Sequence, residues 1–274
     1  MTETLALRAK IEQSPMGAYQ WMIVVMAAIM NLLDGFDVLA LAFTATAIRG
    51  EFGLTGIELG YLLSAGLFGM TAGSLFLAPL ADKIGRRPLL LIAVSLSAIG
   101  MLGSAFISQY QWLGFWRVIT GLGVGGILVG TNVITSEYSS RKWRSFAISV
   151  YAAGFGVGAV LGGMFAVMLQ GEYGWRSVFL AGAILTGLLL VILFIWLPES
   201  IDFLTSKQPK NAEVRLNLIA FLYKRNREKE NKMAGVLGFE PRDAEIKTRC
   251  LTAWRYPNRN SLIGRSEERR VGKE

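Results

Sequence analysis

Apolar residues gather in six long runs along the chain, and charged residues, glycine or proline separate the runs. Each run has about 20 residues, which at helical rise is long enough to cross the roughly 30 Å hydrocarbon core of a bilayer. The pattern therefore predicts six transmembrane helices. Their expected limits are residues 21–46, 57–80, 88–107, 111–134, 146–169 and 177–197.

The remaining segments lack this apolar pattern. Residues 1–20 are polar and show neither the apolar core nor the cleavage site of a signal peptide, so we expect the segment to stay on the chain in the cytoplasm. Residues 199–232 are polar and basic with a weak helical period, which indicates the start of a cytoplasmic central loop. Residues 233–274 have no sustained hydrophobic period, which predicts a disordered tail.

The tail also carries signs of a foreign origin. Its last part, "RSEERRVGKE" at 265–274, is what a common sequencing-library adapter would encode. The segment "GFEPR" at 238–242 resembles the antisense translation of the end of a transfer-RNA gene. We therefore expect the tail to be non-native, with the native sequence ending between Lys224 and Gly238. Cys250 then carries no functional meaning.

The composition is that of a membrane protein. The 274 residues are 53% hydrophobic, with a mean hydropathy of +0.43 and 31 glycines, which is too apolar for one soluble domain of this length. A formal net charge of +8 would also suit nucleic-acid binding. The basic residues, however, lie in loops beside the apolar runs, where they orient a membrane protein during insertion. No nucleic-acid partner is expected.

Lysine and arginine divide unevenly between two sets of loops. One set precedes the first run and follows the second and fourth, and it holds Arg8, Lys10, Lys83, Arg86, Arg87, Arg141, Lys142 and Arg144. The other set holds only Arg49 and Arg176. By the positive-inside rule the first set is cytoplasmic. The sequence thus predicts a multi-pass protein of the cell inner (plasma) membrane, with both ends of its helical bundle in the cytoplasm.

Two residue types limit the chemistry. The chain has no histidine, which removes the commonest general base and excludes a serine–histidine protease or a haem-binding oxidase within the membrane. Its single cysteine excludes an internal disulfide and a cluster of thiolate metal ligands. We expect no metal site, no cofactor and no enzymatic activity. Any proton transfer has to use carboxylates.

Two carboxylates interrupt the first apolar run, in the stretch "NLLDGFDVLA". Asp34 and Asp37 are three residues apart and so share one face of a helix. Asp34 lies about 20 Å along a helix that enters from the cytoplasm, and Arg117 about 9 Å along one that enters from outside, so the two are nearly level. Both aspartates would then face Arg117. Two acids beside one base leave one acid prone to protonation, as a proton carrier requires.

A static structural pair is the alternative, with Asp34 bound to Arg117 and Asp37 facing a water-filled vestibule. Each charge near the centre of a transmembrane helix costs about 2.5–3.5 kcal/mol on insertion scales. Three retained charges therefore favour a functional role. We favour Asp37 as the proton carrier, because it lies nearer the outer opening while Asp34 is more nearly level with Arg117.

Glycine stripes mark the fourth and fifth runs, in "RVITGLGVGG" and "GFGVGAVLGG". Glycine at every fourth position leaves a bare strip on a helix, so that a neighbouring backbone can approach closely. The stripes predict tight helix packing at Gly121 and Gly125 in the fourth run and at Gly154, Gly158 and Gly162 in the fifth.

The turn "APLADKIGRRPLL" between the second and third runs is the most specific segment. Its charged and flexible positions are Asp82, Lys83, Gly85, Arg86 and Arg87, and Pro88 suits the first turn of the next helix. A positive-inside loop explains the basic residues but not the aspartate and glycine. We interpret the segment as a latch.

Several of these segments resemble one family. "APLADKIGRRPLL" is similar to the signature between helices 2 and 3 of the major facilitator superfamily, and "RVITGLGVGG" is similar to its fourth-helix motif. "WLPES" resembles the end of its first six-helix half. "DGFD" narrows the resemblance to the aromatic acid:proton symporters. The similarity covers residues 15–225.

The resemblance implies a fold and a function. The fold is the N-terminal half of a major facilitator, with six transmembrane helices in 3+3 inverted repeats. The function is import of aromatic carboxylates of the benzoate or hydroxybenzoate type together with protons. Asp34 and Asp37 would be needed for transport, and Arg117 would be tied to proton coupling. The cytoplasmic gate would comprise Asp82, Lys83, Gly85, Arg86, Arg87 and Glu137, with Glu137 pairing with the loop arginines.

Carriers of this family have twelve helices in two halves, with the substrate bound between them. We therefore expect a missing C-terminal six-helix half as a partner, besides the lipid bilayer, the aromatic acid and the proton. Three alternatives stay open: a uniporter or a symporter of another organic acid on the same fold, an intramembrane enzyme, and a transporter-derived sensor. The lack of histidine opposes the second, and the third requires a soluble signalling domain that the sequence does not indicate.

Overall fold

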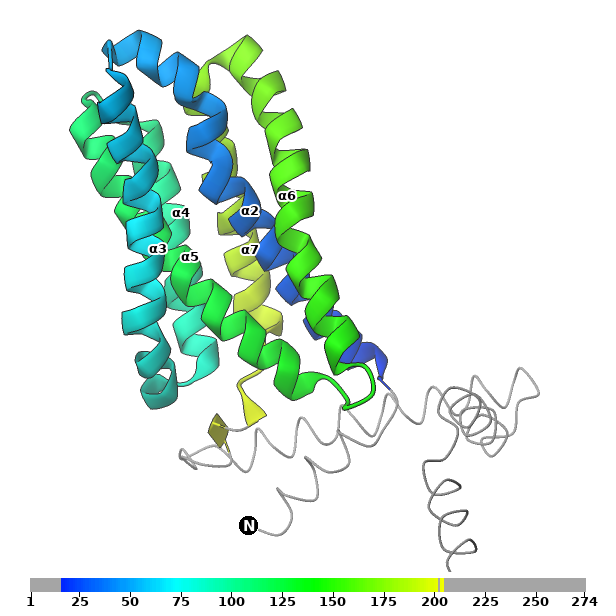
Figure 1. Cartoon of the computed structure of the whole chain (residues 1–274). Helices are drawn as coiled ribbons and strands as arrows, with labels where there is room; N and C mark the ends of the chain where they lie inside the picture. The colour runs from blue at the N-terminus through cyan, green and yellow to red at the C-terminus, as the bar shows by residue number, and fades with distance from the viewer. Residues whose placement is uncertain (1–15, 202, 205–274) are drawn as a thin grey trace, which may run out of the picture. The chain divides into compact units, whose positions relative to one another are not determined.

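A computed structural model describes residues 16–201, 203 and 204. Within that part of the chain every regular element is a helix, and six helices are long and apolar enough to cross a membrane (Figure 1). They are α2 (Ala18–Phe52), α3 (Gly56–Ile84), α4 (Arg86–Ala105), α5 (Tyr110–Tyr138), α6 (Arg144–Tyr173) and α7 (Trp175–Trp196). The prediction of an all-α, six-helix membrane fold is confirmed. Residues 205–274, which hold most of the expected central loop and all of the expected tail, lie outside the described residues, so those expectations stay predictions.

Several helices extend beyond the apolar runs, because polar side chains at a helix end can reach the interface. The helix α2 continues through Arg49 and Glu51 and stops at Gly53, which has a left-handed φ of 63°. The helix α3 begins with a capping box. The Thr55 hydroxyl accepts the Glu58 N–H at 3.3 Å, and the Glu58 carboxylate accepts the Thr55 N–H at 2.8 Å. The turn between α2 and α3 is tight because α2 ends at Gly53 and the capping box at Thr55 begins α3 two residues later.

Two helix pairs pack with their backbones in contact, α2 with α6 and α3 with α5. A Cβ added to Gly158 of α6 would lie 2.6 Å from the carbonyl carbon of Leu32 in α2. A Cβ added to Gly125 of α5 would lie 2.7 Å from the amide nitrogen of Ser74 in α3. The stripes face the partner helix along their length: Gly154, Gly158 and Gly162 face Ala28, Leu32 and Phe36, and Gly121 and Gly125 face Met70 and Ser74. Residues larger than glycine would force these helices apart.

The two pairs correspond to each other within the bundle. If α2–α4 and α5–α7 are two repeats, the packing of α3 on α5 corresponds to the packing of α6 on α2. In each repeat the first helix is more than half buried, and the second helix lies at the periphery (Figure 1). This arrangement is the one that a 3+3 inverted repeat produces. The third helices, α4 and α7, pack against each other.

Large apolar side chains cover the outer faces of the peripheral helices and of α7. Phe68 and Phe76 of α3 are 70% and 68% exposed, and Met168 of α6 and Phe194 of α7 are 72% and 66% exposed. A soluble protein rarely exposes apolar area on this scale, whereas lipid tails cover it without cost. The chain is therefore a multi-pass membrane protein.

One polar cluster ties the bundle at the end where α2 stops. Arg176 at the start of α7 forms a salt bridge with Glu51 at 2.6 Å, and the Trp175 indole N–H donates to the same carboxylate at 2.6 Å. The Arg176 guanidinium also lies 4.4 Å from the centre of the Trp175 ring and donates to the Ile107 carbonyl at 3.3 Å. These contacts join α2, α7 and the turn after α4.

Candidate functional site

The buried polar face of α2 carries Asn31, Asp34 and Asp37 at steps of three residues. A step of three keeps side chains on one face but advances them about 4.5 Å along the axis. The polar face of α2 is therefore long enough to contact different helices at its two ends. Asp37 lies beside α4, α5 and α7, while Asn31 bonds to α6.

Among the described residues, the Asp37 carboxylate forms no salt bridge with Arg117, the base that was expected to face it. Its Oδ2 accepts a hydrogen bond from the Ser97 hydroxyl of α4 at 2.7 Å. Its Oδ1 is buried and has no hydrogen-bond partner among the described residues. That oxygen borders Gly182 of α7, where an added Cβ would lie 3.4 Å from it. The carboxylate thus sits in the seam between α4 and α7.

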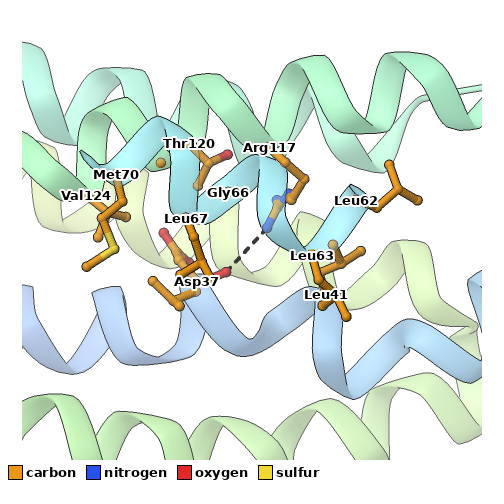
Figure 2. Close-up of a pocket in the computed structure, with 12 residues that line it drawn as sticks. Asp37, Leu41, Leu62, Leu63, Gly66, Leu67, Met70, Arg117, Thr120 and Val124 are labelled. Carbon is orange, nitrogen blue, oxygen red and sulfur yellow. Dashed lines mark hydrogen bonds between the residues drawn. The ribbon is translucent and has the colours of Figure 1, made fainter. Parts of the chain in front are cut away.

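The Arg117 guanidinium is buried among neutral groups. It donates to the backbone carbonyl of Asp37 at 3.3 Å (Figure 2), to the Ser104 hydroxyl at 3.1 Å and to the Met101 sulfur at 2.9 Å. Its central carbon lies 4.6 Å from the centre of the Phe179 ring. Within the described part of the chain, Arg117 forms no salt bridge, and its Nε has no hydrogen-bond partner.

The structure corrects the expectation of which aspartate lies at the same depth in the bundle as Arg117. The position along each helix suggested that Asp34 is opposite Arg117, but Asp37 is the aspartate whose backbone the guanidinium contacts. The difference is about one helical turn. Tilt and packing decide how far along its axis one helix meets another, and the sequence position alone does not contain that information.

Asp34 lies one turn before Asp37 on α2 and is buried. It is 2% exposed, and its Oδ2 has no hydrogen-bond partner in the described structure. On the same face of α2, the Asn31 side-chain amide donates to the Tyr151 carbonyl of α6 at 2.8 Å. The Tyr151 hydroxyl lies 3.1 Å from the Thr131 hydroxyl of α5. Of the two aspartates, only Asp37 contacts Arg117 in the described structure, and it does so through its backbone carbonyl.

A small cavity borders the Asp37 and Arg117 region on the α3 side (Figure 2). Its volume is about 30 Å³. That volume is sufficient for one or two water molecules and far too small for an aromatic ring. The lining residues are Asp37, Val38, Leu41, Leu62, Leu63, Gly66, Leu67, Met70, Arg117, Thr120, Gly121 and Val124.

The turn between α3 and α4 is closed by a carboxylate from the end of the bundle. Gly85 has a φ of 105°, and a Cβ there would lie 2.9 Å from Glu199 Oε2. Glu199 Oε1 accepts the N–H of Arg87, the second residue of α4, at 3.0 Å. The carboxylate thus caps the positive end of α4. Only glycine fits this turn, because of both its backbone conformation and the approach of Glu199.

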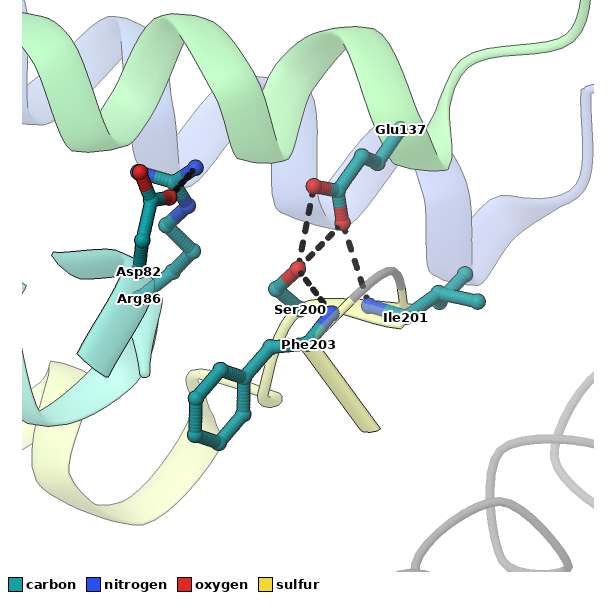
Figure 3. Close-up of polar contacts among 6 residues, drawn as sticks. All are labelled: Asp82, Arg86, Glu137, Ser200, Ile201 and Phe203. Atoms are coloured by element: carbon teal, nitrogen blue, oxygen red, sulfur yellow. Dashed lines mark hydrogen bonds and ion pairs between the residues drawn. The ribbon is translucent and has the colours of Figure 1, made fainter. Parts of the chain in front are cut away.

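The loop arginines have near neighbours in the described structure. Arg86 pairs with Asp82 at 2.6 Å (Figure 3). The Arg87 guanidinium donates to the Phe194 carbonyl of α7 at 2.6 Å. Lys83, in the last turn of α3, is exposed. The turn therefore links α3, α4 and α7 at this end of the bundle.

Glu137 at the end of α5 contacts the segment that follows α7. Its carboxylate accepts the Ser200 hydroxyl at 2.7 Å and the Ile201 N–H at 3.1 Å (Figure 3). The neighbouring Tyr138 hydroxyl donates to the Glu199 carbonyl at 2.7 Å. Glu137 was expected beside the loop arginines. The structure instead places it against Ser200 and Ile201, while Arg86 has Asp82.

The sequence did not reveal several residues of the buried polar site around Asp37 and Arg117, or one residue at the turn between α3 and α4. Ser97, Ser104 and Thr131 look like ordinary small polar residues in apolar runs, and nothing in their spacing singles them out. Glu199 lies within "WLPES", but its position in the sequence alone does not predict a role for its side chain. A carboxylate one residue after a proline at the end of an apolar run was a usable signal, since it lies where a helix N-terminus of the same bundle needs a cap.

A six-helix membrane unit with an inverted repeat, a buried acid and base in its interior and a charged turn after its second helix has the architecture of a secondary transporter. The model of the Major Facilitator Superfamily matches residues 27–260, and the chain belongs to that family.

Two curated relatives are transporters from Pseudomonas putida. The chain is 36% identical to a gallate transporter over 204 residues, which covers 74% of this chain and 45% of the relative. It is 34% identical to the 4-hydroxybenzoate transporter PcaK over 216 residues, which covers 79% of this chain and 48% of the relative. The chain spans about half the length of these relatives.

A solved structure shows the same fold. The proton:xylose symporter XylE bound to 6-bromo-6-deoxy-D-glucose matches with a TM-score of 0.67 and 22% sequence identity. The match covers 80% of this chain and 55% of XylE. At this identity the likeness concerns the fold alone.

Proposed function

We propose that the chain is one half of a secondary transporter that imports aromatic carboxylates of the benzoate or hydroxybenzoate type together with protons. The observation that supports this most is the buried Asp37 and Arg117 site in a chain similar to gallate and 4-hydroxybenzoate transporters. Charges buried in a membrane protein are costly, so their retention favours a role in transport.

Asp37 is the proposed proton carrier. Its Oδ1 has no hydrogen-bond partner among residues 16–201, so a proton can bind there without breaking a contact seen in the structure. Protonation also removes the cost of a buried negative charge. Asp34 is the second proposed acid of the path, one helical turn from Asp37 on α2. Arg117 is the proposed coupling residue, because it touches the backbone of Asp37.

The substrate site is proposed to lie between this unit and a second six-helix half. The cavity of about 30 Å³ beside Arg117 is smaller than any small-molecule pocket, which takes about 300–1,000 Å³. Two-half transporters bind the substrate at the interface of their halves, near the middle of the membrane. In this position an aromatic carboxylate could approach Arg117 and Thr120 through the cavity.

The turn at 82–87 is the proposed gate at the cytoplasmic end, together with Glu137 and Glu199. The bundle would then sit in the inner membrane with both of its ends in the cytoplasm, as its basic loops indicate. The ties among α3, α4 and α7 would have to loosen or move as one body when the two halves rock. In the pair of Arg86 and Asp82, the Asp82 side chain is 69% exposed, so the other half could reach it.

The test is uptake of labelled 4-hydroxybenzoate by this chain co-expressed with the C-terminal half of a similar transporter, with and without a proton gradient. Asp37→Asn should lose accumulation against a gradient but keep exchange, since the amide keeps the size of the side chain and cannot carry the proton. Arg117→Lys should also weaken coupling, because an ammonium lacks the planar fork of a guanidinium. Glu172→Gln, an exposed acid far from the site in sequence, is the matched control.

Each result has a distinct meaning. Accumulation near the parent level in Asp37→Asn and Arg117→Lys would refute the proposed coupling. Uptake that ignores the proton gradient in the parent would indicate a uniporter. Competition by an aliphatic acid in place of benzoate or gallate would show that the substrate is another organic acid.

A further inference from the structure

The Asp37 carboxylate and the Arg117 guanidinium both reach the seam between α4 and α7, but at different heights. Ser97, Met101 and Ser104 follow one another along one face of α4, at steps of four and three residues. Ser97 holds the carboxylate at 2.7 Å, and Ser104 holds the guanidinium at 3.1 Å. Met101 lies between these two positions on the helix. The acid and the base are thus close in space yet bound separately.

The position of the guanidinium has the properties of a docking site for an unpaired cation. The Met101 sulfur at 2.9 Å and the Ser104 hydroxyl at 3.1 Å accept hydrogen bonds, and the Phe179 ring lies 4.6 Å away. A sulfur, a hydroxyl and an aromatic face are neutral groups that each attract a positive charge. Together they compensate a buried guanidinium that forms no salt bridge within the described part of the chain.

Met101 also lies beside both the base and the acid. Its sulfur contacts Arg117, while its methyl group lies against Gly182. The free oxygen of Asp37, Oδ1, borders the same glycine, since a Cβ on Gly182 would lie 3.4 Å from it. Met101 therefore fills space next to both the guanidinium and the Asp37 carboxylate. An unbranched thioether can leave that space by rotating its side chain.

We propose that Met101, Ser104 and Phe179 form a second docking position for Arg117, which the guanidinium occupies while Asp37 carries a proton and leaves for the Asp37 carboxylate when the proton is released. The proposal rests on the proposed proton coupling at Asp37. The proton taken from water is held on Oδ1 and is returned to water, and no other bond is broken. The three residues are positioning residues, because they act on Arg117.

The surroundings of Asp37 explain why its charge would decide the position of Arg117. The charged groups near it are Arg117 from α5 and Asp34 from its own helix, while α4 and α7 present Ser97 and Gly182. A protonated Asp37 is neutral and does not attract the guanidinium, so the docking position is preferred. A charged Asp37 without an adjacent cation would be a buried, unpaired ion, which is strongly unfavourable. When the proton is released, the Arg117 guanidinium therefore moves from the docking position to the Asp37 carboxylate.

The test is infrared spectroscopy of the purified 274-residue chain in lipid nanodiscs, which needs no transport activity. The carbonyl stretch of a protonated carboxyl group is assigned to Asp37 by its loss in Asp37→Asn. At the pH where this band has half its full intensity in the parent, Ser104→Ala and Phe179→Leu should each weaken it at least threefold, because the guanidinium then stays with the carboxylate. Ser95→Ala is the control, since Ser95 is on α4 but bonds only to the Leu91 carbonyl of its own helix.

The outcomes separate the docking proposal from the proposed function. A parent chain without any band that Asp37→Asn removes would refute Asp37 as the proton carrier. A band that is present but unchanged in both variants, as in Ser95→Ala, would overturn the docking position and leave the proton site intact. Ser104→Thr keeps the hydroxyl and should restore the parental intensity, which a general loss of packing would not allow. If Ser104→Ala does not fold, Phe179→Leu decides between these outcomes.

Discussion

Replacement of Gly158 by alanine should disrupt the closest helix contact in the bundle. The added Cβ would lie 2.6 Å from the carbonyl carbon of Leu32, whereas carbon atoms rest at about 3.5–4.0 Å. The atom it meets belongs to the backbone of α2, which cannot rotate away as a side chain can. The two helices would have to separate by about 1 Å over this stretch.

A methyl group forced into a packed interior destabilises the folded state by about 1–3 kcal/mol, and we expect a loss of this size for Gly158→Ala. Alanine also favours a helix over glycine by up to about 1 kcal/mol, which offsets part of this cost. Gly156 supplies the matched control, because it lies on the same helix and a Cβ there meets nothing within 4 Å. The difference between Gly158→Ala and Gly156→Ala cancels the helix preference. We expect a difference of about 1–3 kcal/mol, or about 5- to 150-fold in the ratio of folded to unfolded chain.

The assay is reversible unfolding of the purified chain in mixed micelles, followed by circular dichroism. The free energy of unfolding of Gly156→Ala should equal or exceed that of the parent, and that of Gly158→Ala should be lower. Equal free energies for the two variants would mean that α2 and α6 are not in backbone contact at this level. The packing argument for both glycine stripes would then be wrong.

Two further predictions concern topology and the turn after α3. In a chain without Cys250, Ser108→Cys should react with an impermeant thiol reagent from outside and Lys83→Cys should not, because the positive-inside rule places Lys83 in the cytoplasm; the reverse pattern would invert the orientation. Glu199→Gln should raise hydrogen exchange in the first turn of α4 by about 2- to 30-fold, since a neutral amide caps a helix less well by about 0.5–2 kcal/mol. Glu172→Gln is its control, and equal exchange in both variants would show that the Glu199 charge does not stabilise α4.

The fold was open to prediction because the bilayer imposes a length on each apolar run. All six predicted spans overlap the observed helices. The limits were less accurate: α2 continues six residues beyond the predicted end at 46, to Phe52, because Arg49 and Glu51 are tolerated at a helix end. Hydrophobicity reports what lipid covers, whereas hydrogen bonds and caps decide where a helix stops.

The site was open to prediction only in part. The chemistry of Asp34, Asp37 and Arg117 is visible in the sequence, because charges are rare in apolar runs. Their pairing is not visible, since it depends on the tilt of α2 against α5 and on the rotation of each side chain. Ser97 and Met101 were missed for a related reason. They hold or separate the charges only because α4 packs where it does, and their residue types are common in any transmembrane helix.

The two kinds of packing in the bundle suggest how it moves. The glycine contacts of α2 with α6 and of α3 with α5 leave no space for sliding or for inserted side chains. The seam between α4 and α7, in contrast, is filled by the flexible Met101 and by Phe179, around the acid and the base. A change of charge at Asp37 can therefore be absorbed by side chains, without displacement of the paired helices. We expect the six helices to rock against a second half as one body, with the proton-dependent rearrangement confined to this seam.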